Sequence, residues 1–415
     1  MRKKPKKVSG ERPERQYVPL ANIKVVGVGG GGGNVISRMS QDSLRGVDFI
    51  AINTDHQDLD HCLVRKKIYI GKNLTRGLGT GMNPELGRQA AEENRSEIAE
   101  ALSGADLIFI ASCFGGGTGT GAAPVVAEVA KQTGALTVSF ITKPFAFEGS
   151  QREKITHEGL MKIKDKVDAV IVVPNDRIFT VIDKDTPLIK AFAVVDDVLK
   201  NALKGVVELI VSPGIINVDF ADVRNVIQDA GSAIVGMGIA SGPDRAVAAV
   251  NQALNSPLLE VSAEGAKGVI LGISGGRDLK MTEINEAAKV VAQVADPSAR
   301  IIFGAYHDRK LKPNQIKVTL IATGFTSGAQ AGHSLFESNF SQQKKTDFFE
   351  SFKTTGVYGD KEGEDKNQQE VKGELGKKAP VKSGSSGTKD GVIEDKKDRE
   401  TDIWDIPTFL RKRKK

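Results

Sequence analysis

The sequence of 415 residues predicts an α/β protein. It is expected to have a Rossmann-like first domain, a long central helix, a smaller second α/β domain, and a disordered C-terminal linker that ends in a tail peptide. Short apolar runs alternate with helical stretches from Ile23 to about Phe325, which is typical of a parallel sheet covered on both faces. One apolar pattern, over residues 188–211, is longer than a usual crossover helix. After residue 326 the composition changes.

Each domain is expected to consist of short strands with helices between them. In the first domain the strand-like runs are Ile23–Val28, Asp48–Asn53, Ala105–Ser112, Leu136–Thr142 and Ala169–Val173. In the second, strands are expected near Ala233–Ile239, Gly268–Ile273, Ala299–Tyr306 and Gln315–Thr323, and helices near Asp244–Leu254 and Thr282–Ala295. Apolar residues at steps of three and four predict an amphipathic central helix, which Pro213 and Gly214 end.

Positive charge is concentrated at the two ends of the chain. Residues 1–16 and 411–415 each carry a net charge of +5 while the whole chain carries +6, so the part between them is mildly acidic. A nucleic-acid-binding protein usually carries its charge on the folded surface, and we expect no nucleic-acid partner. No apolar run is long enough for a membrane span. Only two cysteines, Cys62 and Cys113, occur, which favours a reducing cytoplasm.

Composition divides the chain into segments. Residues 327–400 carry nearly balanced charges and few apolar residues, so they cannot bury enough surface to offset the entropy of ordering. Whether Leu335–Phe352 is ordered stays open. Apolar character returns in Ile403–Leu410, which is typical of a docking peptide, although it could be a tail with incidental hydrophobic residues. The expected segments are a basic arm (1–16), the first domain (17–187), the central helix (188–211), the second domain (212–326), the flexible linker (327–400) and the terminal peptide with its basic end (401–415).

Two glycine-rich segments follow predicted strands. Gly27, Gly29 and Gly32 fit the pattern G-x-G-x-x-G, and the segment that follows them is expected to be a loop up to Asn34, before a helix. Gly115–Gly121 is expected to be a second loop, before a helix over Ala122–Thr133. Glycines allow the backbone to approach a phosphate closely, and a helix N-terminus favours an anion.

The number of glycine-rich turns indicates the kind of ligand. One loop would suit a dinucleotide equally well, whereas two loops and a third turn at 77–81 suggest a nucleotide with several phosphates. The chain has no G-x-x-x-x-G-K-[ST] motif, so backbone N–H groups and the threonine hydroxyls of the loop are the expected donors. Arg152 is the nearest candidate cation.

These segments resemble the tubulin/FtsZ superfamily. Gly115-Gly-Gly-Thr-Gly-Thr-Gly121 is similar to that family's signature loop, and the resemblance covers about residues 22–325 and the terminal peptide. It implies a protein that binds GTP, polymerises head to tail and hydrolyses GTP at a site shared by two subunits, as the scaffold of the bacterial division ring. The other matching runs are Gly27–Asn34, Asn53–Asp55, Gly77–Gly87, Thr142–Phe145, Pro174–Asp176 and Asn217–Asp222.

The resemblance also implies which residues bind the nucleotide. Phe192 and Asp196 would meet the base, because a carboxylate can accept from both N1–H and N2–H of guanine. The alternative for Asp196 is a solvated helix face. The remaining binding residues implied by the resemblance are Gly30, Gly31, Gly32, Gly33, Asn34, Asn53, Gly117, Thr118, Gly119, Glu148, Arg152 and Asn175.

Catalysis is assigned by the resemblance to a loop that enters the neighbouring subunit's site. Its residues are Asn217, Asp219 and Asp222. Paired carboxylates can orient water and the Mg²⁺ that accompanies GTP, although no residue of this chain is predicted as a metal ligand. A spacing of three would put both acids on one face of a starting helix. From the residues alone, Asp219 is better explained as an N-cap and Asp222 as a surface acid.

Two other functions fit part of the pattern. The first glycine loop alone would suit a nicotinamide-dependent oxidoreductase, and a superfamily filament protein without a role in division would share most motifs. The chain also departs from the family at Cys113-Phe114, where Gly-Met is frequent. Cys113 would either alter the loop and the hydrolysis rate or be a small buried thiol.

The resemblance implies partners besides a second copy of the chain. Asp402–Leu410 is similar to the family's tail motif, which binds membrane tethers and regulatory division proteins, and Trp404 would be its anchor. The basic ends could contact anionic lipid. We therefore expect a cytoplasmic protein at the mid-cell division site, near the inner face of the membrane.

Overall fold

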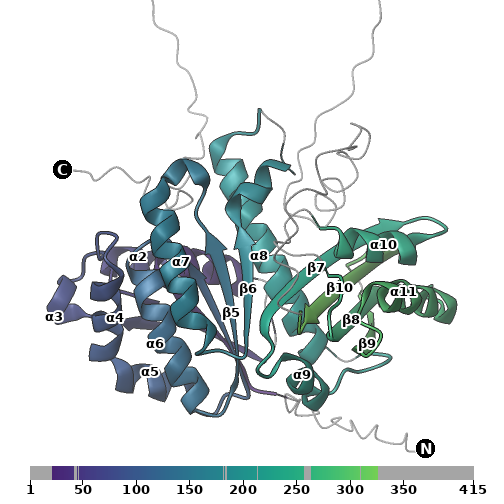
Figure 1. Ribbon diagram of the computed structural model, residues 1–415, viewed down its shortest axis with the longest axis horizontal. Coiled ribbons are helices and arrows are strands. Elements are labelled where there is room, and N and C mark those ends of the chain that lie inside the picture. Colours follow the sequence, from purple (N-terminus) through teal and green to yellow (C-terminus); the bar gives the residue numbers. More distant parts are fainter. Residues whose placement is uncertain are drawn as a thin grey trace, which may run out of the picture.

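The computed structural model describes residues 21–325, except 42–43, 45, 181, 183–184, 213, 257–262 and 309. The predicted basic arm, the linker with its Leu335–Phe352 segment, and the terminal peptide lie outside the described residues. Figure 1 shows an α/β molecule in which a long helix lies between two groups of strands.

One ten-stranded sheet runs through the described part of the chain, in the order β3-β2-β1-β4-β5-β6-β7-β10-β8-β9. Neighbouring strands are parallel except where β10 pairs with β7 and β8. The expected parallel sheet is confirmed for the first domain. The strands are β1 (Ile23–Val28), β2 (Val47–Asn53), β3 (Lys66–Tyr69), β4 (Leu107–Cys113), β5 (Leu136–Lys143), β6 (Ala169–Pro174), β7 (Gly231–Ser241), β8 (Gly268–Gly275), β9 (Arg300–His307) and β10 (Gln315–Thr323).

Helices cover both faces of the sheet (Figure 1). The central helix has the predicted bounds, Leu188–Val211. The helices are α1 (Gly29–Ser40), α2 (His56–His61), α3 (Lys72–Thr75), α4 (Pro84–Glu93), α5 (Arg95–Leu102), α6 (Thr118–Gln132), α7 (Ser150–Lys164), α8 (Leu188–Val211), α9 (Phe220–Ile227), α10 (Arg245–Leu254) and α11 (Met281–Val294), with 3₁₀ turns η1 (Ala146–Glu148) and η2 (Asn175–Thr180). None of the described helices is both long and apolar enough to span a membrane.

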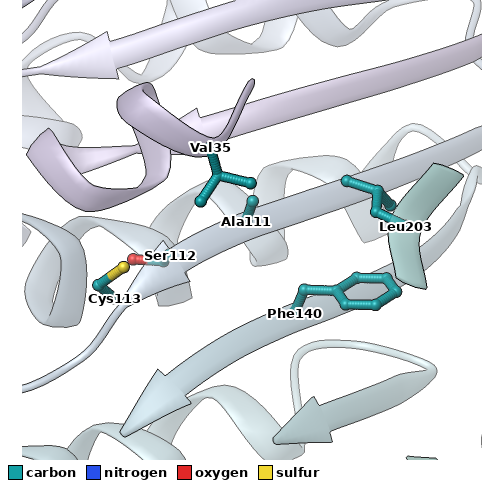
Figure 2. Close-up of a pocket in the computed structure, with 6 residues that line it drawn as sticks. All are labelled: Val35, Ala111, Ser112, Cys113, Phe140 and Leu203. Atoms are coloured by element: carbon teal, nitrogen blue, oxygen red, sulfur yellow. The ribbon is translucent and has the colours of Figure 1, made fainter. Parts of the chain in front are cut away.

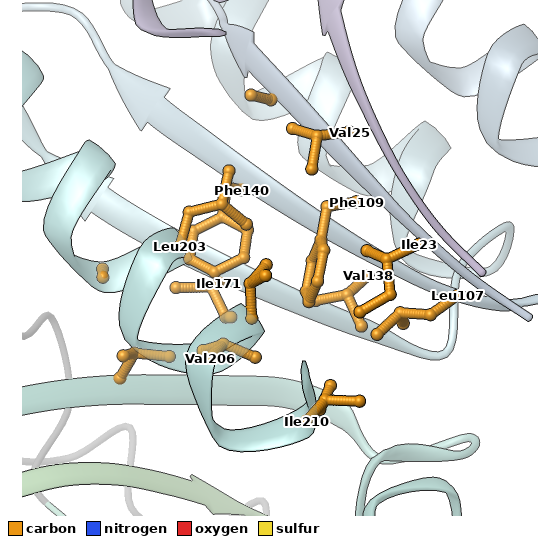
Figure 3. Packing of buried hydrophobic residues seen from close by; sticks show 14 of the residues in the cluster. Ile23, Val25, Leu107, Phe109, Val138, Phe140, Ile171, Leu203, Val206 and Ile210 are labelled. Atoms are coloured by element: carbon orange, nitrogen blue, oxygen red, sulfur yellow. The ribbon is translucent and has the colours of Figure 1, made fainter. Parts of the chain in front are cut away.

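Alternate residues of the parallel strands serve two different cores. Val25 and Phe109 face the side of the sheet covered by α1 and α8, whereas Val26 and Ile110 face α4, α5 and α6. Figure 3 shows Leu203, Val206 and other α8 side chains packed against the first of these faces. A third cluster joins α10 and α11 to the strands of the second domain. Because every central strand is buried on both faces, the sequence shows near-continuous apolar runs there.

A buried arginine ties the second domain together. Arg245, at the start of α10, donates from Nε to Glu283 Oε1 at 2.7 Å and from Nη2 to Glu283 Oε2 at 3.1 Å. Its Nη1 also meets the Asp278 carboxylate at 2.5 Å and Asn314 Oδ1 at 3.2 Å. The Arg245 guanidinium holds the pKa of Glu283 below its usual value, although burial opposes this. The cluster therefore fixes the starts of α10 and α11 against one another.

Replacing Glu283 with Gln should destabilise the protein by about 2 kcal/mol near neutral pH, the scale of hydrogen bonds to charged groups. A depressed carboxylate pKa stabilises above the unfolded value of about 4.3 and loses that contribution as the pH falls through the folded value. Urea unfolding of both proteins across pH should show the difference shrinking in acid. Asp278→Asn is the control and should cost less, since Asp278 is 47% exposed. A gap that stays constant down to about pH 3 would contradict the assignment.

Candidate functional site

The two glycine segments lie side by side at the carboxyl edge of the sheet. β1 and β4 are parallel neighbours with Val28 opposite Ser112, so α1 and α6, which follow them, begin next to each other. Gly29 has a φ of 74°, and a Cβ built there would lie 2.9 Å from the Gly119 nitrogen. The first turns of the two helices are therefore in contact.

Both helices begin earlier than the sequence pattern indicated. The helix expected after Asn34 starts at Gly29, and the helix expected at Ala122 starts at Thr118. Both expectations were wrong for one reason: glycine is a poor helix former, so a glycine-rich first turn has the composition of a loop. Gly30, Gly31, Gly32, Gly33 and Asn34 are thus residues of α1, while Gly117 precedes α6 and Thr118 and Gly119 open it.

Backbone donors converge at this edge. The first N–H groups of a helix have no partner within it and carry the positive end of the helix dipole. Val28 precedes α1 and Gly117 precedes α6, and neither places a side-chain cap on its helix. Two adjacent sets of N–H groups can therefore bind an anion with several negative oxygens.

Only glycine fits where α1 crosses β4. A Cβ on Gly32 would lie 2.3 Å from the Ala111 carbonyl oxygen, and one on Gly31 would lie 2.3 Å from Cys113 Sγ. Cys113 is half-buried and also borders a small pocket with Val35, Ala111, Ser112, Phe140 and Leu203 (Figure 2). The Cys113 thiol thus packs directly against the first turn of α1.

The glycine turn at residues 77–81 packs against the one at residues 115–121. A Cβ on Gly117 would lie 2.0 Å from Thr80 Oγ1. Thr118 Oγ1 lies 2.8 Å from Thr54 Oγ1 and 3.3 Å from Thr80 Oγ1, and Thr120 Oγ1 accepts from Gly115 N at 3.0 Å. These threonine hydroxyls make hydrogen bonds that hold the glycine turns and the end of β2 together. Their expected role as donors to a ligand stays a prediction, as does that of the backbone N–H groups.

The segments that follow β5 and β6 carry three further predicted binding residues. Glu148 Oε1 accepts from Phe145 N at 2.9 Å, and Arg152 Nη1 lies 3.1 Å from Glu148 Oε2. Asn175 Oδ1 is buried and has no hydrogen-bond partner within the described part of the chain. A buried acceptor without a donor is unfavourable, so this oxygen fits a donor supplied by a ligand.

Asn53 lies at the end of β2 and shapes the turn that follows. Its Oδ1 accepts from Thr54 N at 2.9 Å, and its Nδ2 donates to Asp58 Oδ2 at 2.9 Å. Phe192 and Asp196 belong to α8, but their side chains lie outside the described residues, so their contact with a base stays a prediction. Thr54 and Thr80 were not singled out from the sequence, although both occur in the quoted motifs; nothing in the pattern shows that their hydroxyls meet.

The three predicted catalytic residues are exposed and lie together around the start of α9. Asn217 Oδ1 accepts from Gly214 N at 2.6 Å. Asp219 caps α9 by accepting from Ala221 N at 3.1 Å, and Asp222 lies in the first turn. The N-cap predicted from the residues alone is therefore present.

The carboxyl end of α9 lies at the amino edge of the first-domain sheet. Gly231 N donates to Asp168 O at 2.9 Å, and Asp168 immediately precedes β6. The glycine helices start at the opposite, carboxyl edge. A strand of β6's length spans about 20 Å, far more than a side chain can reach. The structure therefore does not bring the acidic residues to the glycine helices of the same chain.

The α/β fold and the paired helix N-termini at the carboxyl edge of the sheet are typical of a nucleotide-binding protein. The profile described as "Tubulin/FtsZ family, GTPase domain" matches residues 22–183, and that described as "FtsZ family, C-terminal domain" matches residues 231–326. The chain belongs to the tubulin/FtsZ family. It is a GTPase that binds GTP and GDP, which decides against the nicotinamide alternative.

Solved structures agree with this assignment. An empty FtsZ dimer of M. jannaschii is 47% identical with a TM-score of 0.70, over 73% of this chain and 88% of that one. A mutant of the same FtsZ is 47% identical, also with a TM-score of 0.70, over 74% of this chain and 91% of that one. A CetZ2 protofilament from Haloferax volcanii shares the fold at 22% identity, with a TM-score of 0.64 over 74% and 94%.

Adding a methyl group at Gly31 should weaken GTP binding at least about tenfold, because the first turn of α1 must move off Cys113. A second substitution should reverse this loss. In the double variant Gly31→Ala with Cys113→Gly, the Cys113 side chain no longer meets the added methyl group, so GTP affinity should return toward that of wild type. Titration with a fluorescent GTP analogue measures both. Cys113→Gly alone is the control and should bind normally. Failure of the second substitution to restore binding would contradict this packing.

Proposed function

We propose that this chain polymerises head to tail into filaments and hydrolyses GTP between subunits, as the scaffold of the ring that divides bacterial cells. The observation that carries the proposal is the separation of the two half-sites. The glycine helices lie at the carboxyl edge of the sheet, whereas Asn217, Asp219 and Asp222 are exposed around α9, which ends at the amino edge (Figure 1). A second copy, stacked in the same orientation, would bring the acids to the nucleotide.

Residues of both subunits would act in this site. The N–H groups of α1 and α6 would hold the phosphates, and Arg152 and Asn175 would contact the nucleotide. Asp219 and Asp222 of the incoming loop would orient and polarise the water that attacks the γ-phosphate. The chemistry supplied by Mg²⁺ is neutralisation of charge on the phosphates. Asn217 would help to hold the loop, since it already fixes Gly214 N.

Exposed apolar side chains flank both half-sites. At the nucleotide edge, Phe147 is 63% and Phe179 is 54% exposed, and both rings pack on Phe145. Beside the catalytic loop, Ile215 is 72% exposed. If the loop enters a neighbour's site, Ile215 arrives next to these rings. The two surfaces differ, as an open head-to-tail polymer requires.

The cellular role is the finer part of the proposal. Asp402–Leu410 would bind membrane tethers and regulatory division proteins, the basic ends would contact anionic lipid, and the filament would act at mid-cell. A filament protein without a division role remains the alternative, because CetZ structures share the fold. Loss of the chain from a dividing cell separates the two: the first predicts a septation defect and the second does not.

GTP turnover against protein concentration tests the shared site. A rate near zero below a threshold, then rising linearly, is expected. Asp222→Ala should abolish turnover while GTP affinity is retained, because the carboxylate serves the neighbour's nucleotide and not the subunit's own. A rate proportional to concentration from the origin, or full turnover in the variant, would overturn the proposal. Light scattering in the same samples reports whether polymer has formed.

The proposed subunit contact can be tested by exchanging apolar groups for charges. Phe147→Lys or Ile215→Glu alone should raise the turnover threshold at least about fivefold, because each leaves a charge against an apolar surface. The two substitutions in one chain should lower it again, since every interface then joins a lysine to a glutamate. Met161→Lys is the control, because Met161 is similarly exposed, at 58%, but lies on α7 and outside the two proposed contact surfaces. A double variant no better than the singles would exclude this contact.

A further inference from the structure

Asp168 connects the catalytic helix to the nucleotide-binding half of the chain. This residue precedes β6 and is only 5% exposed. Its Oδ2 accepts from Thr137 N at 2.8 Å, and its Oδ1 accepts from Asp229 N at 3.4 Å. Its backbone oxygen accepts from Gly231 N at 2.9 Å. One buried residue therefore contacts both β5 and the segment that follows α9.

A lysine of α6 reinforces this junction. Lys131 Nζ lies 3.0 Å from Asp229 Oδ1 and 3.5 Å from Asp168 Oδ1. The hydrogen bond to Asp229 raises the pKa of Lys131, so the ammonium stays charged at neutral pH. Lys131 lies in the last turn of α6, whose first turn, Thr118–Gly121, belongs to the proposed phosphate site. A helix of this length is about 22 Å long, so α6 spans from that site to the end of α9.

The backbone at the junction is held in an unusual conformation. Asp229 has a φ of 50°, a left-handed value that residues other than glycine rarely adopt. Such a conformation persists where its surroundings hold it. The end of α9 is also held from the second domain, because Thr323 Oγ1 donates to Val226 O at 2.9 Å. The short helix that carries Asp222 is thus anchored to both halves of the chain.

We propose that Asp168 is a positioning residue for GTP hydrolysis: it sets the direction in which α9 presents Asp219 and Asp222 to the neighbouring subunit. Asp168 touches no reacting atom and acts through the backbone at Asp229 and Gly231. Lys131 assists it by placing one positive charge beside the carboxylates of Asp168 and Asp229. The inference rests on the proposed function, because positioning matters only if the loop serves a second copy.

The test compares turnover with polymer formation in full-length variants. Asp168→Ala should reduce GTP turnover per polymerised subunit about tenfold or more, because small misplacement of a reacting group is costly. Asp168→Asn, which keeps one acceptor, should fall between this variant and wild type. GTP affinity of the monomer should change less than about twofold, since the glycine helices are untouched. When the amount of GTP is limited, polymers of the variant should persist longer than those of wild type, by the same factor by which GTP turnover is reduced.

Two controls separate positioning from folding. Asp106 occupies the equivalent place before β4, where its Oδ2 accepts from Asn22 N at 2.8 Å and its backbone oxygen accepts from Leu136 N at 2.9 Å. These bonds lie within the first domain, so Asp106→Ala should leave turnover per polymerised subunit unchanged. Lys166→Met removes a partner of Glu128 and should also be silent. Lys131→Met should reduce turnover about twofold, the scale of an exposed ion pair.

The outcomes are distinguishable. If wild type shows a concentration threshold but Asp168→Ala turns over normally, the positioning role is wrong and the shared site stands. If wild type shows no threshold, the proposed function itself fails. Should Asp168→Ala not fold, as judged by circular dichroism and GTP binding, Asp168→Asn and Lys131→Met decide: normal turnover in both would overturn the inference.

Discussion

The parallel pairing of β1 with β4 is the constraint on which the site depends. It sets Val28 opposite Ser112, and two helices then begin within contact of each other. Their first turns fit only because the side chains are absent, since a Cβ on Gly32 would meet the Ala111 carbonyl at 2.3 Å. The glycines therefore have two roles. They allow α1 to lie directly on β4, and they leave the N–H groups of both helices open at the sheet edge.

Much of the fold could be predicted from the sequence, because buried parallel strands and a long amphipathic helix leave strong apolar patterns. β1, β10 and α8 have the predicted bounds. The starts of α1 and α6 could not be predicted, because their glycines have the composition of loops. The antiparallel pairing of β10 with β7 and β8 was not anticipated either, since an apolar run does not encode strand direction.

The candidate site was predicted through motifs, and the motifs say less about what each side chain does. The two glycine-rich segments lie at the carboxyl ends of strands, as the sequence predicted, and their binding of phosphate stays a prediction. The Thr118 hydroxyl, however, pairs with that of Thr54, and the Thr120 hydroxyl accepts from Gly115 N. These contacts depend on how separate segments of the chain pack, which a motif does not encode. Asp168 carries no signal in the sequence: an aspartate before a strand is common, and its meaning comes from Thr137 and Asp229, 31 and 61 residues away.

The position of α9 links the architecture to assembly. This helix follows the carboxyl end of α8. The segment after α9 is hydrogen-bonded to Asp168, at the amino edge of β6, whereas the glycine helices start at the carboxyl edge of the sheet. The two edges of the sheet are separated by the length of β6, about 20 Å. In the proposed function a monomer holds GTP at one edge, and its Asp222 serves the site of another subunit. Under the proposed mechanism, hydrolysis therefore reports that a neighbour is present, and a filament turns over its nucleotide where subunits are joined.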